Sequence, residues 1–137
     1  MREFELALKA AGDPTRTRIL KLLEEGGLCV CQVQAVLRLA PSTVSKHLAI
    51  LRIAGLVEDR RDGRWTEYGL TTEASNPFAG AVLRMLRGLD RDPIVAADRR
   101  RLREIRAIPL VELCVTLPSG ARAQHGPRRS RKERPRV

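Results

Sequence analysis

The chain has 137 residues, of which 43% are hydrophobic, and a formal net charge of +10. This length suits one compact domain with tails, and the charge indicates a polyanionic partner such as nucleic acid. No run of eighteen apolar residues and no basic-then-apolar N-terminal segment occurs, which argues against a membrane partner and predicts a cytoplasmic protein.

Most of the excess charge lies at the C-terminal end. Residues 118–137 carry seven Arg or Lys residues against one Glu, a balance of +6. This segment is rich in Pro, Gly and Arg and has few apolar residues, which predicts a disordered basic tail. We therefore expect a folded domain over residues 1–106 and an extension over residues 107–137.

Two helices are expected at the N-terminal end. Apolar residues recur at helical spacing up to Gly12, which ends the first helix. Asp13 can cap the second helix, and Pro14 suits its first position. The side chains expected to face the core are Phe4, Leu8 and Ala11 in the first helix and Ile19, Leu22 and Leu23 in the second.

A helix, a break and another helix follow. Residues 31–39 read as a short helix, and residues 38–41 read as the break. From about Pro41 to Ala54, the apolar residues Val44, Leu48 and Leu51 fall on one helical face. The remaining face carries small or polar side chains, namely Ser42, Thr43, Ser45, Lys46 and His47.

The segment after Gly55 changes to the pattern of a β-hairpin. The pair Asp62-Gly63 favours the positive φ angles that tight hairpin turns use. Three arginines, Arg60, Arg61 and Arg64, crowd the expected tip. Guanidinium groups at a hairpin tip are suited to contact with a phosphate backbone.

Two further helices are expected beyond the hairpin. Asn76-Pro77 and Asp92-Pro93 are helix starts. The residues expected to face inward are Phe78, Val82, Leu86 and Leu89 in one helix and Ile94, Ala97, Leu102 and Ile105 in the other. The apolar piece around Cys114 is compatible with a strand, a helix end or an arm.

The order helix, break, helix and Arg-tipped hairpin is that of a winged helix-turn-helix protein, mainly α with a small β-hairpin wing. A helix enters the major groove of double-stranded DNA when its outer face carries small polar donors. The residues predicted to contact DNA are Ser42, Thr43, Ser45, Lys46, His47 and Arg52 on the helix, and Arg60, Arg61 and Arg64 on the wing.

The motifs "DPTRTRILKLL", "LCVCQVQ" and "STVSKHLAILRIAGLVEDRRDGRWTEYGL" resemble the ArsR/SmtB family of metalloregulatory repressors. The resemblance implies a homodimer, formed through N-terminal and C-terminal helices, that binds operator DNA and leaves it when a soft metal or metalloid binds. One departure is the entry Ala40-Pro41-Ser42, because alanine is a poor N-cap and shifts the first groove contacts toward Ser42 and Thr43.

The same resemblance implies that Cys29 and Cys31 bind As(III) or Sb(III), which prefer thiolate ligands. Residues i and i+2 of an α-helix lie about 200° apart around its axis, so the two sulfurs of a helical CxC diverge. Binding of one ion would then unwind the start of that helix and loosen DNA binding. The positive end of the helix dipole is expected to favour the thiolate form.

The sequence leaves the identity of a third ligand for As(III) open. Some relatives have a cysteine where this chain has Gln34, so Cys114 is one candidate, from its own subunit or from the partner. The alternative is two thiolates with a hydroxide or an exogenous thiol, and a Cys114 that is only packed.

Other effectors and other classes of protein are alternatives. Another soft metal ion of the Cd, Pb or Zn type is one of them, although the only histidines, His47 and His125, are misplaced for the zinc site of the family's other branch. A thiol-redox switch that pairs Cys29 or Cys31 with Cys114 is another. A thiol enzyme would not explain the groove helix and the wing, so neither catalysis nor a catalytic cofactor is expected.

Overall fold

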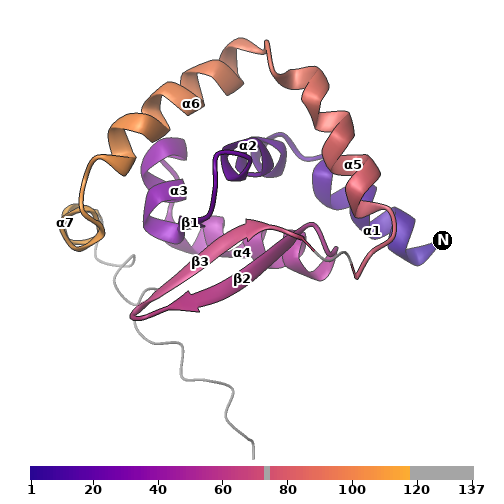
Figure 1. Cartoon of the computed structure of the whole chain (residues 1–137), viewed down its shortest axis with the longest axis horizontal. Helices are drawn as coiled ribbons and strands as arrows, with labels where there is room; N and C mark the ends of the chain where they lie inside the picture. The colour runs from indigo at the N-terminus through magenta and orange to yellow at the C-terminus, as the bar shows by residue number, and fades with distance from the viewer. Residues whose placement is uncertain (73–74, 118–137) are drawn as a thin grey trace, which may run out of the picture.

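The computed structural model describes residues 1–72 and 75–117, and the predicted basic tail lies outside them. The elements along the chain are α1 (Arg2–Ala11), α2 (Pro14–Leu23), β1 (Leu28–Cys29), α3 (Val30–Leu37), α4 (Pro41–Ile53), β2 (Val57–Asp62), β3 (Trp65–Leu70), α5 (Ala79–Met85), the 3-10 helix η1 (Leu86–Leu89), α6 (Pro93–Arg106) and α7 (Leu110–Thr116). Figure 1 shows α5 and α6 as an arch on one side of α2 and α3, with the hairpin on the other side. The predicted mainly helical fold with a small hairpin wing is confirmed.

Aspartate caps set the starts of α2 and α6, as predicted. The Asp13 carboxylate accepts a hydrogen bond from the Arg16 backbone N–H at 3.0 Å, and Asp92 accepts one from the Ile94 N–H at 2.8 Å. Each aspartate is followed by a proline at the first helical position, where the missing N–H has no helical partner to lose.

The core lies where α2, α3 and α4 meet the sheet. Ile19 and Leu20 of α2 and Val44, Leu48 and Leu51 of α4 are all fully buried. This burial confirms the apolar face predicted for α4. The polar face of α4 is therefore directed away from the core.

The sheet joins the hairpin to the segment before α3. Its strand order is β1-β3-β2, and both pairs are antiparallel. Within the hairpin, Asp62 faces Trp65, so the turn residues are Gly63 and Arg64 rather than Asp62 and Gly63. Only Gly63, with φ +57°, adopts a positive φ there. Cys29 faces Glu67, so β1 is hydrogen-bonded to the wing.

Two of the predicted inward faces are confirmed only in part, since Leu102 and Ile105 of α6 and Ala11 of α1 are buried but other predicted members are not. In α6, Ile94 is 57% exposed and Ala97 is exposed, whereas Val95 and Asp98 are buried. Asp98 faces inward because it forms a two-pronged ion pair with Arg18 of α2, with both N–O distances at 2.8 Å.

In the first helix, Ala11 is buried as predicted, but the other two predicted members are not. Its small residues Ala7, Ala10 and Ala11 are buried, while Phe4 and Leu8 are 40% and 37% exposed. Small side chains allow close approach of packed helices. The large apolar residues of α1 are left on the surface of the single chain.

Asn76 has a role beyond starting a helix. Its buried side chain donates to the backbone oxygens of Glu3 and Ala54, at 2.8 and 2.9 Å. It also accepts from the Phe78 N–H at 2.9 Å, and the helix proper starts at Ala79. This one side chain therefore fastens α1, the end of α4 and the start of α5 together.

The segment around Cys114 is the helix α7, which packs against α3. Of the alternatives that its sequence left open, the structure therefore has a short helix. The division into residues 1–106 and 107–137 stays a prediction. No helix among the described residues is long and apolar enough to cross a bilayer.

An ionic cluster fastens α2 to the turn before α6. The buried Lys21 ammonium contacts Glu24 at 2.8 Å and Asp90 at 2.6 Å, and Arg99 lies 3.3 Å from Asp90. Hydrogen bonding from Lys21 lowers the pKa of Asp90 below its ordinary value, and Arg99 adds to the effect. Ionised Asp90 therefore favours the folded state above that ordinary value, and this contribution is lost as the pH falls below it.

We predict that Asp90→Asn lowers stability at neutral pH and that the difference from the parent protein narrows below about pH 3.8, the ordinary pKa of an aspartate. Urea denaturation followed by circular dichroism at about pH 7 and about pH 3 measures both differences. Glu104→Gln, at an exposed position of α6, is the control and should show neither effect. A difference that is equal at the two pH values would contradict the assigned ion pair.

Candidate DNA interface and thiol site

The exposed face of α4 carries the side chains predicted to enter the major groove. Ser42 and Lys46 are exposed, and Thr43, Ser45 and His47 are half-buried. Ala40 is the N-cap and makes no side-chain capping bond, as its residue type implies. The structure thus brings these five side chains to one surface of α4.

His47 has a partner that its sequence context did not reveal. The Arg16 guanidinium donates to the His47 Nδ1 at 3.3 Å, and the same guanidinium donates to the Ala10 and Lys9 backbone oxygens. Because arginine only donates, Nδ1 is the acceptor and Nε2 carries the proton of the neutral ring. Arg16 therefore orients His47 from α2, a contact between residues 31 apart in the sequence.

The wing carries its arginines at an exposed tip. Arg60, Arg61 and Arg64 are exposed, and the Arg64 guanidinium lies 5.7 Å from the centre of the Trp65 ring. Arg60 is 3.5 Å from Glu67 of the facing strand. Their exposure leaves the tip accessible to a large polyanion.

Arg52 connects the recognition helix to the wing. Its guanidinium lies 3.5 Å from the Asp59 carboxylate of β2. The side chain is 42% exposed, so this pair has the modest strength of a surface ion pair. Sequence reasoning assigned Arg52 to DNA and missed Asp59, which no local pattern connects with it.

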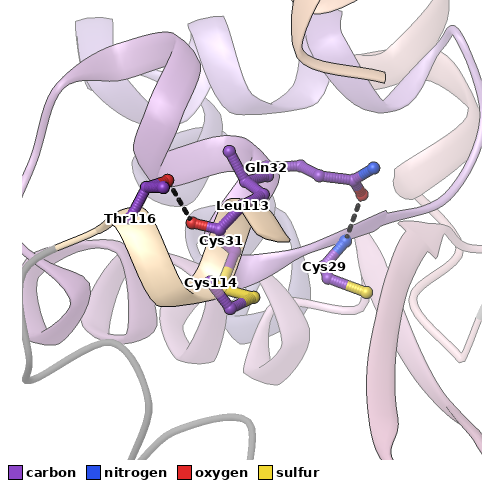
Figure 2. Close-up of a disulfide and its surroundings, with 6 residues drawn as sticks. All are labelled: Cys29, Cys31, Gln32, Leu113, Cys114 and Thr116. Carbon is purple, nitrogen blue, oxygen red and sulfur yellow. Dashed lines mark hydrogen bonds between the residues drawn. A yellow bond between two sulfur atoms is a disulfide. The ribbon is translucent and has the colours of Figure 1, made fainter. Parts of the chain in front are cut away.

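The three cysteines divide into a bonded pair and a single thiol (Figure 2). Cys31, in the first turn of α3, and Cys114 of α7 form a disulfide, with their Cα atoms 5.8 Å apart. Both residues are buried, and Figure 2 shows the Cys29 sulfur turned away from the pair. The structure therefore brings two of the three predicted thiol ligands together.

Cys29 lies before the helix rather than within it. It is the N-cap of α3, with extended φ and ψ of −83° and 159°, and its N–H donates to the Gln32 Oε1 at 2.9 Å. The expectation that both thiols start inside helical geometry is therefore wrong. A movement of Cys29 disturbs the cap and the β1–β3 pairing before it unwinds any turn of α3.

The protonation state of Cys29 also differs from expectation. Burial, together with the smaller effects of the nearby Glu67 and Asp62 carboxylates, raises the pKa of its thiol to about 11. These effects outweigh the helix dipole, because the buried thiolate would face two negative charges. Cys29 is therefore a protonated thiol in this state.

The Cys31–Cys114 pair and the single Cys29 thiol differ in how well they are placed to bind a soft ion. Among residues 1–72 and 75–117, no group of three or more His, Cys, Asp or Glu side chains is arranged to hold a metal. The Cys31 and Cys114 sulfurs already converge, whereas Cys29 must turn to join them. Thiol donors fit a soft ion or metalloid, and Cys31 and Cys114, which form a disulfide here, can supply two such donors once that bond is reduced.

The sequence and the fold are similar to those of known regulators. Residues 13–59 match the model for "Bacterial regulatory protein, arsR family". An uncharacterised HTH-type transcriptional regulator of Methanocaldococcus jannaschii, MJ1325, is 47% identical over 72 residues, which cover 50% of this chain and 81% of that protein. The arsenical resistance operon repressor of Escherichia coli is 44% identical over 64 residues, which cover 46% of this chain and 55% of the repressor.

Among solved structures, HlyU from Vibrio cholerae superimposes with a TM-score of 0.56 at 30% identity, covering 65% of this chain and 92% of HlyU. Because its fold, the polar face of α4 and these relatives agree, the chain belongs to the ArsR family of winged helix-turn-helix transcriptional regulators.

Proposed function

We propose that this protein is a homodimeric repressor that binds double-stranded operator DNA and is released by As(III) or Sb(III) through its cysteine thiolates. The observation that carries the proposal is the meeting of Cys31, in the first turn of α3, with Cys114 of α7, because α3 is the helix that precedes the recognition helix α4. The likeness to an arsenical resistance operon repressor supports the choice of effector. Such a protein acts in the cytoplasm and needs no catalytic cofactor.

DNA is held by the outer face of α4 and by the wing. Ser42, Thr43, Ser45 and Lys46 face outward for base and phosphate contacts, and Arg16 orients His47 beside them. The wing arginines contact the phosphate backbone. Arg52 has a double role, since it also holds β2 against α4 through Asp59.

The exposed apolar residues of α1 and α5 support the dimer. Phe4 and Phe78 pack edge to face with ring centres 5.4 Å apart, and both rings remain more than a third exposed. Leu8 and Met85 extend this patch, with exposures of 37% and 61%. A second copy that covers the patch would bury aromatic and aliphatic surface on both sides.

The structure suggests how thiol binding reaches the DNA. In the reduced protein, Cys31 and Cys114 supply two converging sulfurs, and Cys29 becomes the third ligand only if it turns toward them. That turn withdraws Cys29 from its Gln32 cap and from its pairing with Glu67 of β3. Because β3 forms the wing with β2, the wing is then displaced relative to α4.

A second candidate is a thiol-redox switch, and the Cys31–Cys114 disulfide is the specific observation in its favour. In that case the bond between α3 and α7, rather than a metalloid, sets the DNA-binding state. Cys29, which is unpaired with another cysteine, would be dispensable. A further soft metal ion would use the same thiols as arsenite.

Arsenite should release operator DNA from the reduced protein, whereas peroxide alone should not. We expect Cys31→Ser and Cys29→Ser to bind DNA with nearly normal affinity and to lose most of the release, which for an allosteric coupling of 1–3 kcal/mol is about five- to 150-fold. Electrophoretic mobility shifts with titrated arsenite or peroxide measure this difference.

The Cys114→Ser variant tests in the same assay whether Cys114 is a ligand. We expect it to weaken the arsenite response, and an unchanged response would contradict the use of the Cys31 and Cys114 sulfurs as a pair. Release by peroxide, with no response to arsenite, would replace the proposed function by the redox switch.

Arg64→Ala should weaken DNA binding by a similar factor for specific and nonspecific sequences. Each lost phosphate contact lowers the slope of log affinity against log salt by about 0.9. Fluorescence anisotropy with labelled duplexes at several salt concentrations gives that slope. Arg103→Gln, which removes one exposed positive charge from α6, is the matched control, and an equal change in both variants would contradict a wing contact.

A further inference from the structure

A cavity of about 630 Å³ lies on the far side of α3 from the sheet, apart from the wing tip. Its walls are the end of α3, the turn into α4, the end of α6, and α7. Apolar side chains supply much of the lining, including Ile105, Leu113 and Leu117. The volume is that of sites that hold small organic molecules.

Gln34 gives the cavity an unused hydrogen-bond acceptor. The residue is 3% exposed and lines the cavity, and its buried Oε1 has no hydrogen-bond partner among residues 1–72 and 75–117. Buried amide oxygens are nearly always paired, because leaving one unpaired costs the free energy of its desolvation. A ligand with an O–H or N–H group would satisfy this oxygen.

The charged groups of the lining have one sign. Of the described residues, Arg38 and Arg101 are the charged ones that line the cavity, and no Asp or Glu of this part of the chain does. Arg101 donates through Nε to the Ala35 backbone oxygen at 3.1 Å, which anchors its guanidinium at the end of α3. Arg38, the C-cap of α3, stands in the left-handed conformation with φ +56°. Two guanidinium groups of this kind favour a carboxylate.

We propose that this cavity binds an amphipathic organic anion, a hydroxy acid whose carboxylate meets Arg38 and Arg101 while its hydroxyl donates to Gln34. The apolar body of the ligand would lie against Ile105, Leu113 and Leu117. The charge of the lining argues against residues 118–137 as the occupant, because that segment carries +6. The exposed patch of α1 and α5 lies at the opposite end of the molecule, as Figure 1 shows, so a second copy seated there does not fill this cavity.

The location connects the cavity with the DNA-binding surface. Arg38, Ala40 and Pro41 line it, and they form the turn that leads into α4. A bound acid would therefore contact the residues at which the recognition helix begins. This site is separate from the arsenite-binding thiols and holds whether or not that proposal does.

Isothermal titration calorimetry of the full chain with its disulfide intact tests the site, with para-coumarate, cinnamate and para-coumaryl alcohol as probes. Cinnamate lacks the phenolic hydroxyl, and the alcohol lacks the carboxylate. We expect para-coumarate to bind about fivefold more tightly than cinnamate, as one hydrogen bond allows, and about tenfold more tightly than the alcohol.

Two variants assign those preferences to residues. Gln34→Met, which keeps the volume and removes the acceptor, should equalise para-coumarate and cinnamate. Arg38→Gln should reduce the preference for the acid over the alcohol, and Arg103→Gln, on the exposed face of α6, should change neither. The proposal would be overturned if none of the probes showed saturable binding up to about 1 mM. It would also be overturned if the parent protein bound the three probes with equal affinity, a comparison that requires no variant to fold.

Discussion

The short helix α3 depends on neighbours for its stability, and most of the proposed chemistry follows from which neighbours these are. A helix of eight residues is not stable alone in water. Its start is continuous with β1, which pairs with the wing strand β3, and its first turn is bonded to α7 through Cys31 and Cys114. The end of α3 is held by Arg101 of α6. A change at the thiols therefore acts on an element with contacts to both the wing and the C-terminal helices.

Two arginines of α6 hold the chain on either side of Cys29 and Cys31 in place. Arg106 donates to the Glu25 backbone oxygen at 2.7 Å, in the loop just before β1, and Arg101 donates to the Ala35 backbone oxygen at 3.1 Å, near the end of α3. Arg18 and Asp98 fix the same helix to α2. The helix α6 thus holds the loop before β1 and the end of α3, and the segment between these two contacts, which includes Cys29 and its cap, is the part left to rearrange.

Local patterns predicted the parts of this structure that local chemistry determines. The caps at Asp13 and Asp92, the buried face of α4 and the Arg-tipped hairpin all depend on residues close in sequence, and the structure contains each of them. The predictions of burial and contact were wrong or open where residues far apart in the sequence contact each other. Asp98 faces α2 because of Arg18, 80 residues away, and Cys31 meets Cys114 at a separation of 83. Periodicity within α6 could not reveal the first contact, and the thiol pairing was one of several open alternatives.

The central claim is that thiol binding reaches DNA through the pairing of β1 with β3. Hydrogen–deuterium exchange on the reduced protein, with and without arsenite, measures the protection of residues 28–32 and 66–70 directly. The account predicts that arsenite speeds amide exchange in both segments at the concentrations that release DNA. If DNA is released while both segments stay as protected as in the free protein, the wing is not the route and the account is wrong.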